Sequence, residues 1–368
     1  MRIGHVVTLL SPDGAYGGPM RVAQNQLAEL QARGHDVRLY TTHRGFSVAP
    51  VETGGIPVTA LPARTVMPGM GFAGTGSWRL LRALTKDLAH LDVLHVHLAR
   101  DFVTLPAARL ALASGVPLVL QTHGMIDPSE RLLSRPLDAG LTRPVLSRAS
   151  AVLALNATEE DHLRVVSGGS AEIVRLVNGV PLPPDVGQPL DEVLYLGRLH
   201  ERKRPAVFVE AALRIAGRHP GVRFTVAGPD EGEGDRLRHM VESHGRPSNI
   251  SLGAAVPPEK VLGRMSRARV FVLPSVREPF PMAVLEAASL GLAIVMCEDN
   301  GLASIFREAG AALVSNPDPD AVASAIEVLL NDPSAARQLG CRARRLVATH
   351  FTIGSVVDKL ELIYGAAS

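Results

Sequence analysis

Two glutamates, Glu278 and Glu286, stand eight positions apart at the start of an expected helix and could bind hydroxyl groups. They belong to the segment Pro274–Glu286, which follows Arg269–Leu273, an apolar run typical of a buried β-strand. Backbone amides at a helix start suit phosphates or sugar oxygens, and carboxylates accept hydrogen bonds from hydroxyls. The alternative is an acidic first turn that compensates the helix dipole, with one solvated glutamate.

Two basic residues, Arg198 and Lys203, follow a second strand-like run, Glu192–Leu196. Preorganised cations can stabilise a phosphate group, but a position after a strand does not by itself assign them that role. Lysine is rare in the chain, with four residues against 34 arginines, which slightly favours a function for Lys203. The alternative is an ordinary solvated run of charge, because the local sequence is Glu-Arg-Lys-Arg.

A glycine-rich turn that ends in Gly17 and Gly18 follows the first expected strand and precedes a helix. Glycine lets a backbone approach a phosphate closely. The spacing differs from the dinucleotide fingerprint, and no acidic residue ends the second expected strand, Leu39–Thr42. The turn therefore disfavours an enzyme that uses a nicotinamide cofactor.

Three histidines lie on or just after expected strands. His123 follows the run Pro117–Gln121, at the end of a strand where a parallel sheet binds its ligand. The alternative interpretation is a structural histidine that makes a hydrogen bond within a turn. His95 and His97 share one face of a strand and could suggest a metal site. Because no third ligand stands at motif spacing, packing near the strand end is the preferred interpretation.

Other short motifs have ordinary structural interpretations. Asp318-Pro319-Asp320 resembles a metal motif but fits a helix cap with proline in the first turn. Asn156 opens a glycosylation sequon, whereas Thr158 with the acids after it predicts an N-cap. The expected helix Ser77–Lys86 carries the only Trp among basic residues, so it fits either sheet covering or membrane docking.

The elements that position these residues are parallel β-sheets covered by helices. Short Val, Ile and Leu runs alternate with helical patterns, which predicts βαβ units. At about 150 residues per domain, the 368 residues predict two domains, with a proline-rich linker after Val180. Ligands of such sheets bind beyond the carboxyl ends of the strands. Residues 60–77, rich in Gly and Pro, predict a long flexible loop.

Composition excludes several classes of protein. The 38 basic and 36 acidic residues nearly cancel, which disfavours a nucleic-acid partner. Two cysteines exclude a disulfide framework or a multi-cysteine zinc site and favour a reducing compartment. The first ten residues predict a strand and not a signal peptide, and no apolar run is long enough to span a bilayer. We therefore expect a cytoplasmic protein.

Taken together, the motifs resemble the retaining glycosyltransferases of family 4, which have the GT-B fold. The glutamate pair resembles the donor-site motif of that family. Further segments agree with the family in order along nearly the whole chain: Gly17-Gly18-Pro19, Arg33-Gly34-His35-Asp36-Val37, Asp92–His97, Thr122-His123-Gly124, Asn178-Gly179-Val180, Gly197-Arg198-Leu199 with Lys203, and Ala227-Gly228-Pro229. Each motif is weak alone, but their joint order is specific.

The resemblance implies roles for the residues at matching positions. Arg198 and Lys203 would hold the donor diphosphate and stabilise its charge as the sugar leaves. Glu286 would bind the ribose hydroxyls, while Glu278 and His123 would contact the transferred sugar; an inverting enzyme would instead use such a histidine as general base. The catalytic residues are then His123, Arg198, Lys203 and Glu278. The donor-binding residues are Gly17, Gly18, Arg198, Lys203, Gly228, Phe280, Met282, Ala283 and Glu286.

The implied fold is α/β: two doubly wound, Rossmann-like domains that face a central cleft. We expect an acceptor domain over residues 1–182, a linker over 183–190, a donor domain over 191–350, and a segment, 351–368, whose helix returns to the first domain.

The implied reaction moves a hexose-type sugar from a nucleoside-diphosphate sugar to an acceptor hydroxyl, with retention of configuration and without a metal or other cofactor. A UDP or GDP sugar is the first expectation for the donor, and the acceptor is a glycan, a lipid or a small-molecule hydroxyl. Peripheral contact with the inner face of the membrane stays open. The alternatives are a nucleotide-sugar epimerase or hydrolase of the same fold and a non-catalytic nucleotide-sugar-binding protein.

The chain departs from the family pattern at Pro281, where the motif commonly has glycine. Proline removes one N–H and fixes φ near about −65°. A first helical turn tolerates proline, so stability should not suffer. We expect a preferred sugar that does not need that amide, being deoxygenated or inverted at the hydroxyl that faces residue 281.

Overall fold

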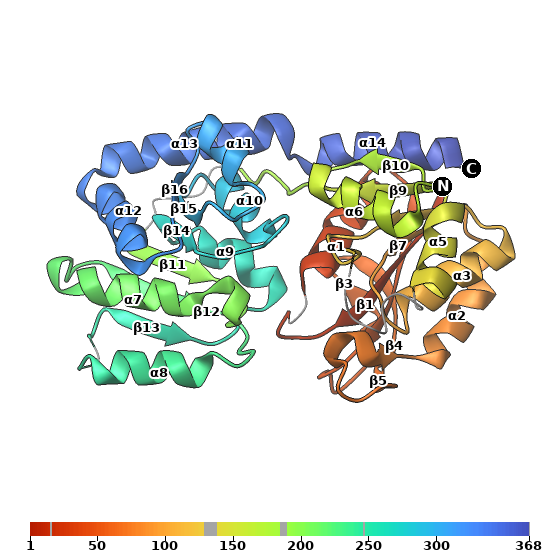
Figure 1. Cartoon of the computed structure of the whole chain (residues 1–368), viewed down its shortest axis with the longest axis horizontal. Coiled ribbons are helices and arrows are strands. Elements are labelled where there is room, and N and C mark those ends of the chain that lie inside the picture. The colour runs from red at the N-terminus through yellow and green to blue at the C-terminus, as the bar shows by residue number, and fades with distance from the viewer. Residues whose placement is uncertain (15–16, 129–137, 185–189, 246, 368) are drawn as a thin grey trace. The chain divides into compact units, whose positions relative to one another are not determined.

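The computed structural model describes residues 1–14, 17–128, 138–184, 190–245 and 247–367. The chain divides into two compact units (Figure 1): unit 1 is Met1–Pro12, Tyr16–Gly179 and Ile353–Ser368, and unit 2 is Asp13–Ala15 and Val180–Thr352. The expected linker, 183–190, thus falls within the range of unit 2, and its residues 185–189 lie outside the described part of the chain.

Unit 1 is built on a sheet with the strand order β10-β9-β8-β7-β1-β2-β4-β3. All its pairs are parallel except β3 with β4. The strands are β1 Arg2–Leu10, β2 Asp36–His43, β3 Glu52–Thr53, β4 Ile56–Pro62, β7 Val93–His97, β8 Leu118–Gln121, β9 Ala151–Ala154 and β10 Ile173–Arg175. The order turns back between β7 and β1, which makes a switch point there.

Helices cover both faces of this sheet, which explains why its central strands are apolar on both sides. One face packs on α2, α3, α5 and α6, and the other packs on α1 and α14. The helices are α1 Gly17–Ala32, α2 Trp78–Leu88, α3 Thr104–Ser114, α5 Arg143–Arg148, α6 Ala157–Ser167 and α14 Ile353–Ala367, with a π-helical turn at Asp138–Thr142 before α5.

Residues 60–77 contain regular structure, so the expectation of one long flexible loop was wrong. The segment ends β4, forms an antiparallel ribbon of β5 (Arg64–Thr65) with β6 (Thr75–Gly76), and includes a 3-10 turn at Gly71–Gly74. Glycine serves close packing here, because a Cβ atom on Gly74 would lie 2.2 Å from the carbonyl oxygen of Met67. Glycines that predict flexibility from sequence thus permit a tight turn.

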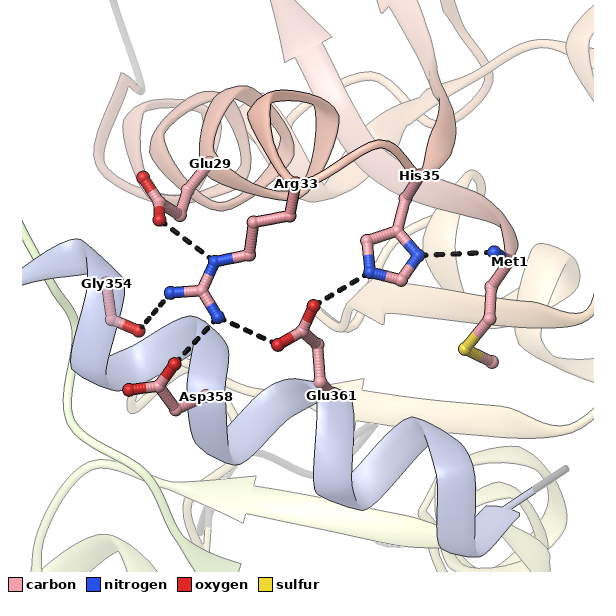
Figure 2. A network of polar contacts seen from close by, with 7 residues as sticks. All are labelled: Met1, Glu29, Arg33, His35, Gly354, Asp358 and Glu361. Atoms are coloured by element: carbon pink, nitrogen blue, oxygen red, sulfur yellow. Dashed lines mark hydrogen bonds and ion pairs between the residues drawn. The ribbon is translucent and has the colours of Figure 1, made fainter.

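Helix α14 belongs to unit 1 although it follows unit 2 in the chain. Figure 2 shows the polar network that holds it: Arg33, which follows α1, donates to Asp358 at 2.7 Å, to Glu361 at 2.8 Å and to the carbonyl oxygen of Gly354 at 2.9 Å. His35 also contacts Glu361, at 2.8 Å. Hydrogen bonding from His35 and Arg33 lowers the pKa of the Glu361 carboxyl. The network fixes α14 on α1.

Unit 2 has an all-parallel sheet with the order β13-β12-β11-β14-β15-β16. Its strands are β11 Glu192–Leu196, β12 Arg223–Ala227, β13 Ile250–Gly253, β14 Val270–Leu273, β15 Ala293–Cys297 and β16 Leu313–Ser315. Its helices are α7 Pro205–Ile215, α8 Gly234–Ser243, α9 Val261–Met265, α10 Met282–Ser289, α11 Ala303–Glu308, α12 Pro319–Asn331 and α13 Pro333–His350. Short 3-10 turns span Glu201–Lys203, Ala216–Arg218 and Pro258–Lys260.

The strand order of unit 2 turns back between β11 and β14, which pair with each other. Segments that leave the carboxyl ends of these two strands therefore meet at one edge of the sheet. Within the described chain, no helix is both long and apolar enough to cross a bilayer.

Candidate functional site

The basic segment after β11 and the glutamate segment after β14 contact each other in unit 2. The Arg202 side chain donates to the carbonyl oxygen of Arg277 at 2.6 Å, and the Val276 N–H donates to the carbonyl oxygen of Arg202 at 3.0 Å. These bonds bring Lys203 and Glu278, 75 positions apart, into an ion pair. Two candidate residues from distant parts of the sequence are thus direct neighbours.

The Lys203–Glu278 pair is shielded from water. Each side chain is 17% exposed, and Glu278 Oε2 is buried without a hydrogen-bond partner in the described residues. A buried carboxylate oxygen without a partner costs free energy unless a ligand supplies a donor. The pair therefore offers a cation to an anionic group and an unused acceptor to a hydroxyl.

Backbone strain occurs at candidate residues or directly beside them in the chain. Within the described chain, three residues other than glycine have positive φ: His123 at 52°, Arg204 at 52° and Arg277 at 50°. Arg204 follows Lys203, Arg277 precedes Glu278, and His123 is itself a candidate. Left-handed conformations of such residues cost about 1 kcal/mol or more each and concentrate at functional sites.

Arg198 is held by an acid that sequence reasoning missed. Its side chain pairs with Glu231 at 2.7 Å and is 33% exposed, and its carbonyl oxygen accepts from the Tyr195 hydroxyl at 2.9 Å. Gly228 has a backbone role in this region: its φ is 153°, and an added Cβ would lie 1.9 Å from the carbonyl oxygen of Gly197. Both expected diphosphate-binding cations therefore pair with carboxylates.

The start of α10 differs from the expectation in one respect. Pro281 is the N-cap residue of α10, with φ −75° and ψ 103°, and does not lie in the first helical turn. Met282 and Ala283 are the first two helical residues, and their N–H groups belong to the turn that has no intrahelical acceptor. The missing proline N–H thus precedes the helix proper.

The side chains around that helix start are largely buried. Glu286, on α10, is 5% exposed, and Met282 is 9% exposed. Phe280 makes an edge contact with Phe351, at 6.0 Å between ring centroids. Glu286 is therefore packed within the first turns of α10 and is not a solvated glutamate on the helix surface.

The turn that carries His123, in unit 1, is fixed by Glu159. Glu159 Oε1 accepts from the Thr122 hydroxyl and from the Gly124 N–H, both at 2.5 Å, and Oε2 accepts from the Leu155 N–H at 2.7 Å. Glu159 is 3% exposed and comes from α6. By bonding to the residues on either side of His123, Glu159 holds His123 in its left-handed conformation. The sequence did not reveal this role.

Gly17 and Gly18 form the first turn of α1. An added Cβ on either would meet no atom within 4 Å, so packing inside the protein does not require glycine here. The first turn also carries no acid. The open space beside the two glycines and a first turn without an acid are compatible with an approaching anion.

His95 and His97 are buried on β7, as packing requires. Within the described residues, no group of three His, Cys, Asp or Glu side chains could hold a metal ion. Asp318 is the N-cap of α12, with Oδ1 accepting from the Asp320 N–H at 2.8 Å and the Ala321 N–H at 3.2 Å, which confirms the cap interpretation.

Local geometry bears on two further expectations. The N-cap of α6 is Asn156, whose side chain accepts from the Glu159 N–H at 2.9 Å, so the expected cap at Thr158 was wrong. Asn is as good an N-cap residue as Thr. Because α6 begins after Asn156, the side chain of Glu159 is left to bind the turn that carries His123. On α2, Leu80 is buried while Trp78 is 57% exposed. This helix covers the sheet, and membrane docking through Trp78 stays a prediction.

Comparison with known proteins assigns the family. The family described as Glycosyl transferases group 1 matches residues 187–346, and the family described as Glycosyl transferase 4-like domain matches residues 17–179. The chain belongs to the group 1 glycosyltransferases. It is therefore an enzyme of the glycosyltransferase class, as the motifs predicted.

Individual relatives agree with this family. The chain is 28% identical to the D-inositol 3-phosphate glycosyltransferase of Acidothermus cellulolyticus, over 91% of this chain and 83% of that protein. It is 25% identical to the alpha-D-kanosaminyltransferase of Streptomyces kanamyceticus, over 68% and 70% of the two chains. The Anabaena protein HepE, solved in complex with UDP and glucose, has the same fold with a TM-score of 0.78, 16% identity and 99% coverage of both chains. The expected GT-B fold is confirmed.

Proposed function

We propose that this glycosyltransferase moves a hexose-type sugar from a nucleoside-diphosphate sugar to an acceptor hydroxyl with retention of configuration. The observation that carries the proposal is the ion pair of Lys203 with Glu278 at the switch point of unit 2. It presents a cation for a phosphate and an unpaired carboxylate oxygen for a hydroxyl in one place. A nucleoside-diphosphate sugar carries both groups next to each other.

Each candidate residue has a role in this proposal. Lys203 and Arg198 turn from their carboxylate partners to the donor diphosphate and stabilise the negative charge that grows on it. Glu278 accepts from a hydroxyl of the sugar, and Glu286 accepts from the ribose hydroxyls. His123 contacts the transferred sugar.

The helix starts supply backbone donors. Amides of Met282 and Ala283, beside Phe280, donate to the sugar and its phosphate, and the first turn of α1 at Gly17 and Gly18 does the same for an anionic or hydroxyl oxygen. Gly228 keeps the backbone after β12 against the backbone after β11, so that Arg198 is placed correctly.

The proposed chemistry needs no protein nucleophile. The bond from the sugar C1 to the phosphate oxygen breaks, the bond from C1 to the acceptor oxygen forms on the same face, and the leaving phosphate oxygen takes the acceptor proton. The protein contributes by positioning the groups and by stabilising charge. In this proposal Lys203 and Arg198 supply the positive charge at the leaving group, so the reaction does not call on a metal.

Comparison supports the donor class. HepE was solved with UDP-glucose, and a pneumococcal O-GlcNAc transferase of the same fold, with TM-score 0.74 and 11% identity, was solved with UDP and GlcNAc. UDP and GDP sugars are therefore the first donors to test. The curated relatives carry the names of several different transfer reactions at 25–28% identity, so the proposal names the acceptor only as a hydroxyl.

A two-part experiment tests the proposal. Thermal unfolding with UDP, GDP, ADP and dTDP sugars first identifies the donor, because a ligand at 100 times its Kd adds about 2.7 kcal/mol to stability. Release of the nucleoside diphosphate is then followed with and without a panel of sugars, inositols and glycolipids. Transfer predicts release that depends on an acceptor and a product that keeps the anomeric configuration of the donor. Acceptor-independent release identifies a hydrolase, and binding without release identifies a binding protein.

A further inference from the structure

A turn after β15 packs against the segment that carries Glu278. The turn spans residues 298–302, between β15 and α11, and β15 is the neighbour of β14 in the sheet of unit 2 (Figure 1). Asn300 shapes this turn: its N–H donates to the carbonyl oxygen of Cys297 at 3.1 Å, and its Oδ1 accepts from the Leu302 N–H at 3.1 Å. The proposed function assigns no role to these residues.

Three contacts join the turn to the segment after β14. The Gly301 N–H donates to the carbonyl oxygen of Glu278 at 2.9 Å, and Asn300 forms an isolated parallel β-bridge with Glu278. Asn300 Nδ2 also donates to Ser275 Oγ at 3.3 Å. Ser275 is fully buried and Asn300 is 3% exposed, so the Asn300 amide is shielded from water and loss of its hydrogen bonds is costly.

Close packing requires glycine at position 301. A Cβ atom added to Gly301 would lie 2.0 Å from the carbonyl oxygen of Pro279 and 3.2 Å from that of Glu278. Both neighbours are backbone atoms, which cannot turn away as the end of a flexible side chain does. The φ of Gly301 lies outside the left-handed region, so the requirement is for space and not for an unusual backbone conformation. A larger residue here must push the Glu278 segment away.

The segment after β11 holds the other side of the same backbone. The carbonyl oxygen of Arg202 accepts from the Val276 N–H, and the Arg202 side chain donates to the carbonyl oxygen of Arg277. Because β14 lies between β11 and β15 in the sheet, residues 276–278 are bonded from both sides. Such support fits the φ of 50° at Arg277, since a strained conformation persists only where its surroundings hold it.

We propose that Asn300 and Gly301 are positioning residues that act through Glu278. They fix the backbone at residue 278 so that Glu278 Oε1 meets Lys203 and Oε2, which has no partner within the described residues, is presented to a hydroxyl of the donor sugar. Neither positioning residue contacts the sugar. The inference deepens the proposed function and rests on it for the sugar, whereas its geometric part concerns the chain alone.

Gly301→Ala tests the proposal through the size of the new side chain. Moving the Pro279 carbonyl oxygen from 2.0 Å to at least 3.0 Å from the new Cβ displaces the segment by about 1 Å. Because a misplacement of about 1 Å can cost about 100-fold in rate, we expect about a 100-fold loss of kcat/KM for the intact donor. The Kd of the free nucleoside diphosphate, which lacks the sugar, should stay within about twofold of wild type. An unchanged kcat/KM, or an equal loss for both ligands, would overturn the proposal.

Gly340→Ala is the matched control. A Cβ atom on Gly340 would lie 1.9 Å from the carbonyl oxygen of Gly291, which is a similar clash in the same unit. Gly291 precedes β15, however, and therefore lies at the opposite edge of the parallel sheet from Glu278, which follows β14. We expect both variants to lower the urea midpoint and only Gly301→Ala to lower kcat/KM. Equal losses of kcat/KM would overturn the proposal, because a general loss of structure would explain both.

A double variant tests whether Gly301 acts through Glu278. In a chain that already carries Glu278→Ala, adding Gly301→Ala should change kcat/KM by less than about threefold, because the carboxylate to be misplaced is absent. A further loss as large as in wild type would overturn the proposal.

Asn300→Ala carries the same tests if Gly301→Ala does not fold. It removes the bonds to Ser275 and from the Leu302 N–H without adding an atom, so we expect a smaller loss of kcat/KM, about 10-fold. Asn249→Ala is its control, because the Asn249 amide also bonds to backbone carbonyl oxygens but does so at the amino ends of the strands, just before β13. Equal kcat/KM values of these two variants would overturn the proposal.

Urea unfolding tests the geometric part without a ligand. Lys203→Met lowers the urea midpoint by breaking the pair with Glu278, and this shift should be about halved or smaller in the Gly301→Ala background, because the displaced carboxylate no longer meets Lys203. In the Gly340→Ala background the shift should equal that in wild type. The same shift in all three backgrounds would overturn the proposal. This result does not depend on sugar transfer, so a failure of the proposed function, seen as no acceptor-dependent release, is distinguishable from a failure of this inference.

Discussion

Breaking the ion pair of Lys203 with Glu278 should affect stability and catalysis in different ways. An exposed pair contributes about 0–1 kcal/mol, and removing one partner of a fully buried pair costs about 3–5 kcal/mol. With both side chains 17% exposed, we expect about 2 kcal/mol for either Lys203→Met or Glu278→Gln. The double variant should also lose about 2 kcal/mol instead of about 4, because neither charge is then left unpaired.

Catalysis should not recover in the double variant. Lys203→Met removes a cation from the leaving diphosphate, which costs about 3 kcal/mol of transition-state stabilisation, or about a 100-fold loss in kcat/KM. The assays are urea unfolding and acceptor-dependent release of nucleoside diphosphate. Lys260→Met is the matched control, since Lys260 is an exposed lysine of the same unit.

Three results would refute this reasoning. Additive stability losses would show that the pair is not coupled, and equal activity of the Lys203→Met and Lys260→Met variants would show that Lys203 does not meet the diphosphate. Activity that a chelator abolishes and magnesium restores would show that a metal, and not these cations, neutralises the leaving group.

Three further predictions follow from the site and from α14. Glu286→Gln should weaken both the free nucleoside diphosphate and the intact donor, whereas Glu278→Gln should weaken only the donor, by about 1.5–3 kcal/mol in calorimetry; equal losses for both ligands would contradict the division. Pro281→Gly should broaden donor use toward glucose or mannose, because the restored N–H can pair with a sugar hydroxyl and strengthen binding by about 1 kcal/mol. A ratio of kcat/KM values among donors that is the same in the variant and in wild type would argue against it. Because the pKa of Glu361 is lowered in the folded chain, its carboxylate stabilises the fold above the usual glutamate pKa, and this stabilisation is lost as the pH falls through the lowered value. In Glu361→Gln the free energy of unfolding should therefore decrease less steeply below about pH 4.5, by about 1 kcal/mol or less. An unchanged decrease would refute the pairing with Arg33.

The local pattern of the sequence was sufficient to predict parallel sheets covered by helices, and the family resemblance supplied most of the candidate residues. Apolar runs such as Arg269–Leu273 alternate with helical segments, and this alternation alone indicates parallel sheets. Glu278 could be chosen because its segment follows a strand and enters a helix, whereas Lys203 was chosen through the family resemblance. Local chemistry also identified the cap at Asp318, where the side chain bonds to its own helix.

The residues that the sequence did not reveal act across long distances in the chain. Glu231 reaches Arg198 from 33 positions away, and Glu159 reaches the His123 turn from 35 or more. An acid in a first helical turn has the same local pattern whether it faces solvent or a neighbouring loop, so only tertiary packing distinguishes the two cases. Tyr364 is the extreme example, since it meets His5 from 359 positions away.

The central claim is that the donor diphosphate binds at Arg198 and Lys203, and a crystal structure of the full chain with UDP or GDP tests it most directly. The account predicts that a phosphate oxygen lies within ion-pair distance of Lys203 Nζ and of the Arg198 guanidinium, with the ribose hydroxyls on Glu286. A diphosphate bound elsewhere, with the ion pairs of Lys203 to Glu278 and of Arg198 to Glu231 both intact, would contradict it.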